Sequence, residues 1–181
     1  MPDALKKHRL TIARILAFLA VVAISVFVYS IRDRAEEFAV YGYPGIFVLA
    51  FLANATVLLP APGIAVVFAM GGVFNPLLVG LAAGAGGSLG ELSGYLAGFS
   101  GQGVLEHVDI YNRMVAWMRR YGDLTVLVMA AIPNPFFDIT GLAAGALKMP
   151  FWRFLFWAWL GITFKMIVFA YFGAASLPVF F

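Results

Sequence analysis

The chain has 181 residues, of which 63% are hydrophobic and only 12% are charged, whereas soluble domains average roughly 45–50% apolar and about 25% charged residues. This composition excludes an ordinary water-soluble domain and predicts an integral membrane protein. The formal net charge of +3, the absence of cysteine and the presence of only two histidines argue against a nucleic-acid partner, a metal site and any other cofactor.

The first predicted transmembrane helix covers the 17 uncharged residues from Ile15 to Ile31. This length is about the minimum that crosses a hydrocarbon core of roughly 30 Å. The cations Lys6, Lys7 and Arg9 before it are typical of a signal peptide, but no small-residue cleavage site follows. We therefore expect an uncleaved N-terminal anchor and a short charged linker in residues 1–37.

The first half of the membrane region must contain helix breaks, because residues 38–90 carry no formal charge and are too many for one crossing. A doubled proline followed by glycine usually ends a helix. Pro60, Pro62 and Gly63 predict one break and Pro76 predicts another. The expected helices are Gly45–Leu59, Ile64–Phe74 and Leu77–Phe99.

Residues 100–123 are expected to form an interfacial amphipathic helix. Tyr111, Val115, Met118 and other apolar residues recur there at helical spacing, and charged residues take the other side. Such a helix connects two halves that lie in opposite orientations. A second role is lipid headgroup contact through basic residues, and the candidates are Arg113, Arg119 and Arg120.

The second half of the chain repeats the pattern of the first. A break at Pro133, Asn134 and Pro135 and another at Pro150 precede a long apolar helix over 151–172. The breaks are 16 residues apart in the first half and 17 in the second. We therefore predict repeat one at 44–99 and repeat two at 124–173, within a membrane domain at 38–173 followed by a short tail at 174–181.

Two topologies are compatible with these breaks. If each proline-broken pair is a re-entrant hairpin, the chain crosses three times and nine cations lie on the side of the N-terminus, against two on the other side. If each pair spans as one kinked helix, five crossings result and the cations divide six against five. The positive-inside rule favours the hairpins and a cytoplasmic N-terminus in a plasma or inner membrane.

The predicted fold is therefore all-α, with three transmembrane helices and two proline-broken re-entrant hairpins in an inverted repeat, together with the interfacial helix. Backbone that re-enters the membrane is tolerated only where protein or water covers it. Paired, oppositely oriented repeats with broken helices are an architecture that secondary transporters use.

A stripe of glycines marks the helix expected over 77–99, at alternating spacings of four and three residues with Glu91 in its midst. Its members are Gly80, Gly84, Gly87, Gly94 and Gly98. Glycine lets another helix approach closely in lipid. The partner of this face is either another helix of the same chain or a second copy in a homodimer.

Three ionisable residues lie inside predicted membrane helices: Glu91, Asp138 and Lys165. Glu91 and Lys165 each follow the last proline of their repeat by 15 residues, and Asp138 follows the second break. An ionisable group in a transmembrane helix costs about 2.5–3.5 kcal/mol, so it is retained mainly when paired or functional. A structural salt bridge explains the three residues, and a phosphate site formed by Lys165 and the N-termini of the half-helices explains them equally well.

Enzyme signatures are weak. The run Gly86-Gly87-Ser88-Leu89-Gly90 matches the nucleophile-elbow pattern of hydrolases, but that pattern requires a strand, a sharp turn and a helix. Here the serine lies within a predicted helix, so we do not expect an enzyme.

Several of these motifs together resemble the DedA family, also described as the VTT or SNARE-associated Golgi protein homology domain. The resemblance covers about Tyr43 to Phe172. It rests on the run from Gly87 to Gly98, the Leu59–Gly63 break, and Ile132–Pro135 followed by Gly141, Gly145 and Pro150-Phe151.

The resemblance implies two facing re-entrant hairpins, each followed by a transmembrane helix, and movement of lipids between leaflets. Bacterial members are linked to recycling of undecaprenyl phosphate or phosphatidylethanolamine, and eukaryotic relatives resemble phospholipid scramblases. Many members carry an acidic residue after the first break and arginines around the second. This chain has Ile64 there, and Ala130, Ala131 and Phe136 around the second break, so those roles do not transfer.

The expected function is thus translocation of a phospholipid or polyprenyl phosphate between leaflets, as a scramblase or flippase with membrane lipids as partners. The headgroup would follow a polar cleft between the hairpins, with Glu91, Asp138 and Lys165 as its binding residues. Two alternatives stay open: a proton- or cation-coupled transporter of a small solute, and a structural membrane protein that binds a partner helix.

Overall fold

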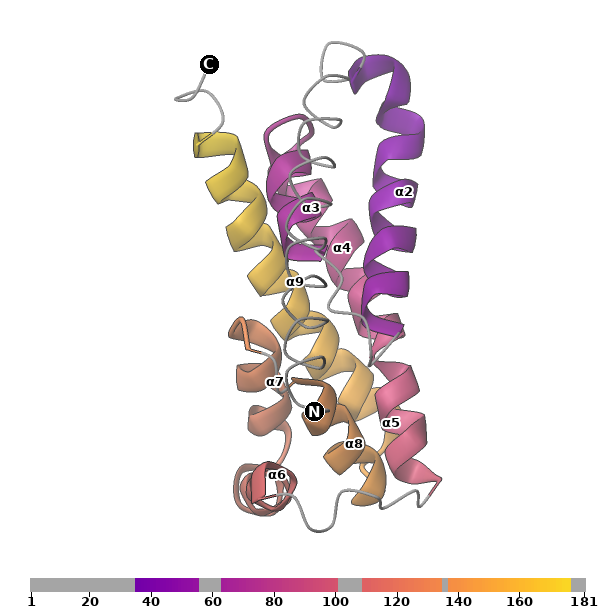
Figure 1. Cartoon of the computed structure of the whole chain (residues 1–181), viewed down its shortest axis with the longest axis vertical. Helices are drawn as coiled ribbons and strands as arrows, with labels where there is room; N and C mark the ends of the chain where they lie inside the picture. The colour runs from indigo at the N-terminus through magenta and orange to yellow at the C-terminus, as the bar shows by residue number, and fades with distance from the viewer. Residues whose placement is uncertain (1–34, 56–62, 101–108, 135–136, 177–181) are drawn as a thin grey trace, which may run out of the picture.

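The computed structural model describes residues 35–55, 63–100, 109–134 and 137–176. These residues form helices and contain no strand, which confirms the all-α class for this part of the chain (Figure 1). The first half contains α2 (Ala35–Ala55), α3 (Gly63–Gly71), α4 (Pro76–Gly90) and α5 (Leu92–Phe99). The second contains α6 (Asp109–Tyr121), α7 (Asp123–Ala131), α8 (Phe137–Ala146) and α9 (Phe151–Ser176). The predicted helix over 15–31 and the residues Pro60, Pro62 and Pro135 lie outside the described residues.

The helix boundary before α4 follows from its capping chemistry. Pro76 is the first residue of α4, where the missing N–H costs nothing. The Oδ1 atom of Asn75 accepts hydrogen bonds from the backbone N–H groups of Leu77 and Leu78, at 3.0 and 3.3 Å. These bonds satisfy donors that the start of a helix leaves unpaired.

The break after α7 has a matching explanation. Ile132 adopts an extended backbone conformation, which the following Pro133 favours for steric reasons. The Nδ2 group of Asn134 donates to the carbonyl oxygens of Met129 and Ile132, both at 2.8 Å. The side chain of Asn134 thus satisfies carbonyls that the end of α7 leaves free.

The helices pack in two sets that repeat each other. In the first half α2 packs on α4, and in the second half α7 packs on α9 in the same way. Between the halves, α3 packs on α9 and α8 packs on α5. The helices α4 and α9 also pack on each other. Figure 1 shows α3 and α8 near opposite ends of the bundle and α9 running opposite to α4 and α5. α3 of the first half therefore packs on α9 of the second half, and α8 of the second half packs on α5 of the first.

The two halves of the chain contact each other where α3 meets α9 and where α5 meets α8, and four glycines let the backbones approach closely there. A methyl group at any of them would overlap the backbone of the facing helix. The contacts are Gly71 on Ala170, Gly173 on Phe68, Gly145 on Tyr95 and Gly98 on Leu142. Gly71 and Gly145 are 74 residues apart, and so are Phe68 and Leu142. The same separation relates Pro76, the first residue of α4, to Pro150, the residue before α9. The second pair of contacts thus repeats the first.

The single helix expected over 77–99 is instead divided at Glu91 into α4 and α5. The backbone ladder nevertheless continues across the junction, because the N–H of Glu91 donates to Gly87 at 3.1 Å and that of Tyr95 donates to Glu91 at 3.2 Å. The expectation of one regular helix was wrong, and the irregularity falls on its one charged residue.

The surface of α9 indicates a lipid environment. Its buried residues include the small Ala158, Gly161 and Gly173, whereas Trp152 and Phe164 are exposed. Exposed large apolar side chains on this scale mark contact with an apolar phase, and small residues between helices are typical of membrane proteins. Among the described residues, α9 is the helix that is long and apolar enough to cross a membrane, and residues 42–55 form a shorter apolar stretch.

The predicted interfacial helix corresponds to α6, which Figure 1 shows end-on, lying across the lower end of the bundle. Met114 and Met118 are buried against the bundle. The chain then turns into α7 at Gly122, whose φ of +57° is accessible to glycine without a steric penalty.

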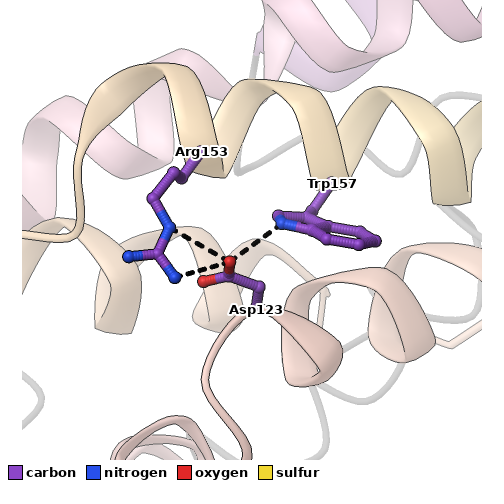
Figure 2. A network of polar contacts seen from close by, with 3 residues as sticks. All are labelled: Asp123, Arg153 and Trp157. Carbon is purple, nitrogen blue, oxygen red and sulfur yellow. Dashed lines mark hydrogen bonds and ion pairs between the residues drawn. The ribbon is translucent and has the colours of Figure 1, made fainter.

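Asp123, the first residue of α7, ties this end of the bundle to α9 (Figure 2). Its Oδ2 atom accepts from Nε and Nη2 of Arg153, at 3.0 and 2.7 Å, and from Nε1 of Trp157, at 2.9 Å. The two donors lie one turn apart on α9, so one carboxylate oxygen holds the starts of two helices together.

Candidate functional site

The structure brings Glu91, Asp138 and Lys165 into one cluster. Glu91 lies at the junction of α4 and α5, Asp138 in the first turn of α8, and Lys165 in the middle of α9. The carboxyl groups of Glu91 and Asp138 lie within interaction range of each other, and Lys165 interacts electrostatically with both. The Nζ atom of Lys165 also lies 5.8 Å from the ring centroid of Phe137, within cation–π range.

The nearness of the two carboxyl groups bears on the charge of the cluster. Two carboxylates that share a site repel each other, so protonation of one of them is favoured. With one proton on the pair, its single negative charge is balanced by the ammonium of Lys165. Glu91 is 2% exposed, and a neutral cluster is what such deep burial requires.

Two glycines lie at the contact of α5 and α8 beside the carboxyl groups. A methyl group at Gly94 would lie 3.5 Å from the carbonyl oxygen of Asp138, and one at Gly141 would lie 3.7 Å from that of Glu91. The backbones of α5 and α8 therefore run close together beside the cluster. A methyl group at either position would make ordinary van der Waals contacts with the facing helix.

The glycine stripe faces helices of the same chain. Gly80, Gly84 and Gly87 lie against α9, next to Ile167, Thr163 and Ile162 respectively. Gly94 and Gly98 lie against α8, next to Asp138 and Leu142.

The break residues lie at the ends of the short helices. Gly63 begins α3, and Pro133 and Asn134 separate α7 from α8. The N-terminus of α8 already has an anionic side chain, because Asp138 occupies its first turn, where a negative charge is favourable. A phosphate approaching this end of α8 would therefore meet Asp138.

The basic residues of α6 lie apart from the charged cluster. Arg113, Arg119 and Arg120 are all exposed, and the guanidinium carbon of Arg120 lies 5.3 Å from the ring centroid of Tyr121. Their position on a helix across the end of the bundle suits contact with headgroups.

Two further polar contacts support the site but were not predicted. The hydroxyl of Tyr95, one turn after Glu91, donates to the carbonyl oxygen of Met149 at 2.6 Å, which ties α5 to the turn between α8 and α9. The carboxylate of Asp123 holds α7 to α9. The sequence gives no local signal for either contact, since both join residues distant along the chain.

Comparison with known proteins identifies the region that contains the cluster. The model of the VTT domain matches residues 59–175. The vacuole membrane protein KMS1 of Arabidopsis thaliana is 34% identical over 39% of this chain and 22% of its own length. The vacuole membrane protein 1 homolog of Dictyostelium discoideum is 33% identical over 44% of this chain and 19% of its own length. The chain thus matches about a fifth of these relatives, and no solved structure matches it.

Proposed function

The chain belongs to the VTT domain family of membrane proteins, and on this premise we propose that it moves a phosphate-bearing lipid from one leaflet to the other. The substrate is a phospholipid or a polyprenyl phosphate. No covalent bond is formed or broken. The proposed location is a plasma or inner membrane with the N-terminus in the cytoplasm.

The observation that supports this proposal most is the charged cluster between the two halves. Lys165 is half-buried within an apolar helix and interacts electrostatically with the carboxyl groups of Glu91 and Asp138. A lipid phosphate is an alternative anionic partner for the same ammonium group. The headgroup would bind Lys165 in place of the carboxyl pair, and the acyl chains would stay in the surrounding lipid.

The packing of α8 suggests how such a path opens. α8 meets α5 through backbone contacts at Gly98 and Gly145, so the two helices share few interlocking side chains there. Separation of α8 from α5 would part Asp138 from Glu91 and expose Lys165. Movement of one repeat against the other is the general mode of inverted-repeat transporters.

The test is a lipid transfer assay with purified protein in vesicles that carry a fluorescent phospholipid. Dithionite destroys fluorophores in the outer leaflet, so further loss reports lipid that has crossed the membrane. We expect Lys165→Met and Glu91→Gln to suppress this loss while expression is retained. Lys148→Met removes an exposed lysine from the turn before α9 and serves as the control with unchanged activity.

The outcomes separate the candidate substrates. Full activity of Lys165→Met would refute the role of the cluster. No loss above protein-free vesicles would exclude the labelled phospholipid, and the assay would then be repeated with a labelled polyprenyl phosphate. A vesicle-leakage control distinguishes lipid transfer from entry of dithionite.

The two adjacent buried carboxyl groups favour one second candidate, a proton- or cation-coupled transporter of a small solute. Ionisable groups inside a membrane domain are suited to bind and release a proton as Lys165 changes partner. Under this alternative, transport would require an ion gradient and Asp138→Asn would uncouple it. Lipid transfer in vesicles without a gradient would support scrambling instead.

A further inference from the structure

A groove lies between α6 and α7, on a different part of the molecule from the charged cluster. Its volume is about 460 Å³, which is within the range of small-molecule sites, roughly 300–1,000 Å³. The lining residues are Trp117, Tyr121, Leu124, Thr125, Val128 and Met129. Leu124 and Val128 are exposed although apolar, so the groove offers an open apolar surface.

The lining also contains a buried hydroxyl group. Thr125 is 6% exposed, and its Oγ1 atom has no hydrogen-bond partner in the part of the chain that the structure describes. Buried hydroxyl groups are nearly always paired, so an unpaired one indicates a missing acceptor or donor. A ligand with a polar group above an apolar chain would supply it.

Basic residues lie within one helical turn of Trp117, one of the lining residues of the groove. Arg113 and Arg120 are exposed one turn before and one turn after Trp117 on α6, and Arg120 stacks on Tyr121 at 5.3 Å. Asp123, at the start of α7, is bound by Arg153 and Trp157. Asp109 lies one turn before Arg113, but the three arginines of α6 outnumber this one acid, so α6 carries a net positive charge. Trp and Tyr favour the level of the headgroups in a bilayer.

We propose that the α6–α7 groove binds an anionic glycerophospholipid. The phosphate lies at Arg113 and Arg120, an ester oxygen of the glycerol region pairs with Thr125, and one acyl chain follows Leu124 and Val128. The arginines, the Thr125 hydroxyl and the apolar side chains thus match the phosphate, the ester group and the acyl chain of a lipid, in that order. This site is independent of lipid transfer through the charged cluster.

The experiment uses the absence of native cysteine. Val128→Cys in the groove is labelled with a small fluorophore, and the protein is reconstituted in phosphatidylcholine vesicles. Nitroxide-labelled phosphatidylglycerol or phosphatidylcholine is then added at equal mole fraction, and quenching reports occupancy. Phe164→Cys, on the exposed face of α9 outside the groove, is the matched control.

We expect phosphatidylglycerol to be preferred at Val128→Cys by about fivefold for each arginine engaged, with no preference at Phe164→Cys. Arg113→Gln with Arg120→Gln should abolish the preference, and Thr125→Val should weaken binding about two- to tenfold. Equal quenching by both lipids at Val128→Cys, or the same preference at both positions, would overturn the proposal. Lys165→Met should leave this quenching unchanged, so failure of lipid transfer and failure of this site are distinguishable.

Discussion

Gly98 provides the most direct test of the packing between α5 and α8. A methyl group at Gly98 would lie 2.8 Å from the carbonyl carbon of Leu142 and 2.9 Å from its Cα, whereas carbon atoms normally pack at about 3.5–4.0 Å. The overlap is with backbone, so rotation of a side chain does not relieve it. Gly98→Ala must move α8 away from α5 by roughly 1 Å.

Gly94 is the matched control because it lies one turn earlier on the same face of α5. A methyl group there would lie 3.5 Å from its nearest neighbour, the carbonyl oxygen of Asp138, which is an ordinary contact. Overpacking costs about 1–3 kcal/mol, and exchanging glycine for alanine in a helix gains about 0.5–1 kcal/mol. Gly98→Ala should therefore lower the free energy of unfolding by about 1–2 kcal/mol, whereas Gly94→Ala should leave it unchanged or raise it slightly.

Thermal unfolding in detergent, followed by intrinsic tryptophan fluorescence, measures the difference between the two variants. A gap of about 2 kcal/mol corresponds to about 4–8 °C for a chain of this size. Gly98→Ala should also raise lipid transfer, because displacement of α8 parts Asp138 from Glu91 and favours the opening that exposes Lys165. Equal melting temperatures for the two variants would refute the close backbone approach of α5 and α8.

Two other contacts give predictions of similar precision. Tyr95→Phe leaves the carbonyl oxygen of Met149 without its donor and should cost about 0.5–1.5 kcal/mol of stability, measured in the same unfolding assay; no change would mean that another donor replaces the hydroxyl. Arg153→Gln should cost no more than about 1 kcal/mol, because the Arg153 side chain is 61% exposed and exposed ion pairs with Asp123 are screened. High salt should lower the free energy of unfolding of the wild type toward that of Arg153→Gln. If the difference between the two proteins does not depend on salt, the variant has lost packing and not charge.

The helix breaks were predictable because their causes are local. Pro133 fixes the conformation of its neighbour, and Asn75 followed by Pro76 is a strong helix start. The amphipathic pattern of α6 likewise follows from spacing alone. These features need no knowledge of the rest of the fold.

The meeting of the charged residues was predictable only in part. The cost of placing Glu91, Asp138 and Lys165 in lipid gave a reason for them to pair, but their sequence positions do not show which groups lie together. That depends on the approach of α8 to α5 at Gly94 and Gly141, a long-range contact. The division at Glu91 was missed because the glycine spacing around it fits one regular helix.

The crossing of the two halves also has a consequence for biosynthesis. Gly71 in α3 packs against Ala170 in α9, a residue that the ribosome adds about 100 residues later. Translation adds roughly 5–20 residues per second, so Ala170 is synthesised on the order of 5–20 seconds after Gly71. During that time, the close-packing surface of α3 is open to lipid, to insertion factors or to quality-control proteases. Chains truncated before α9 should therefore be recognised and degraded as unfinished.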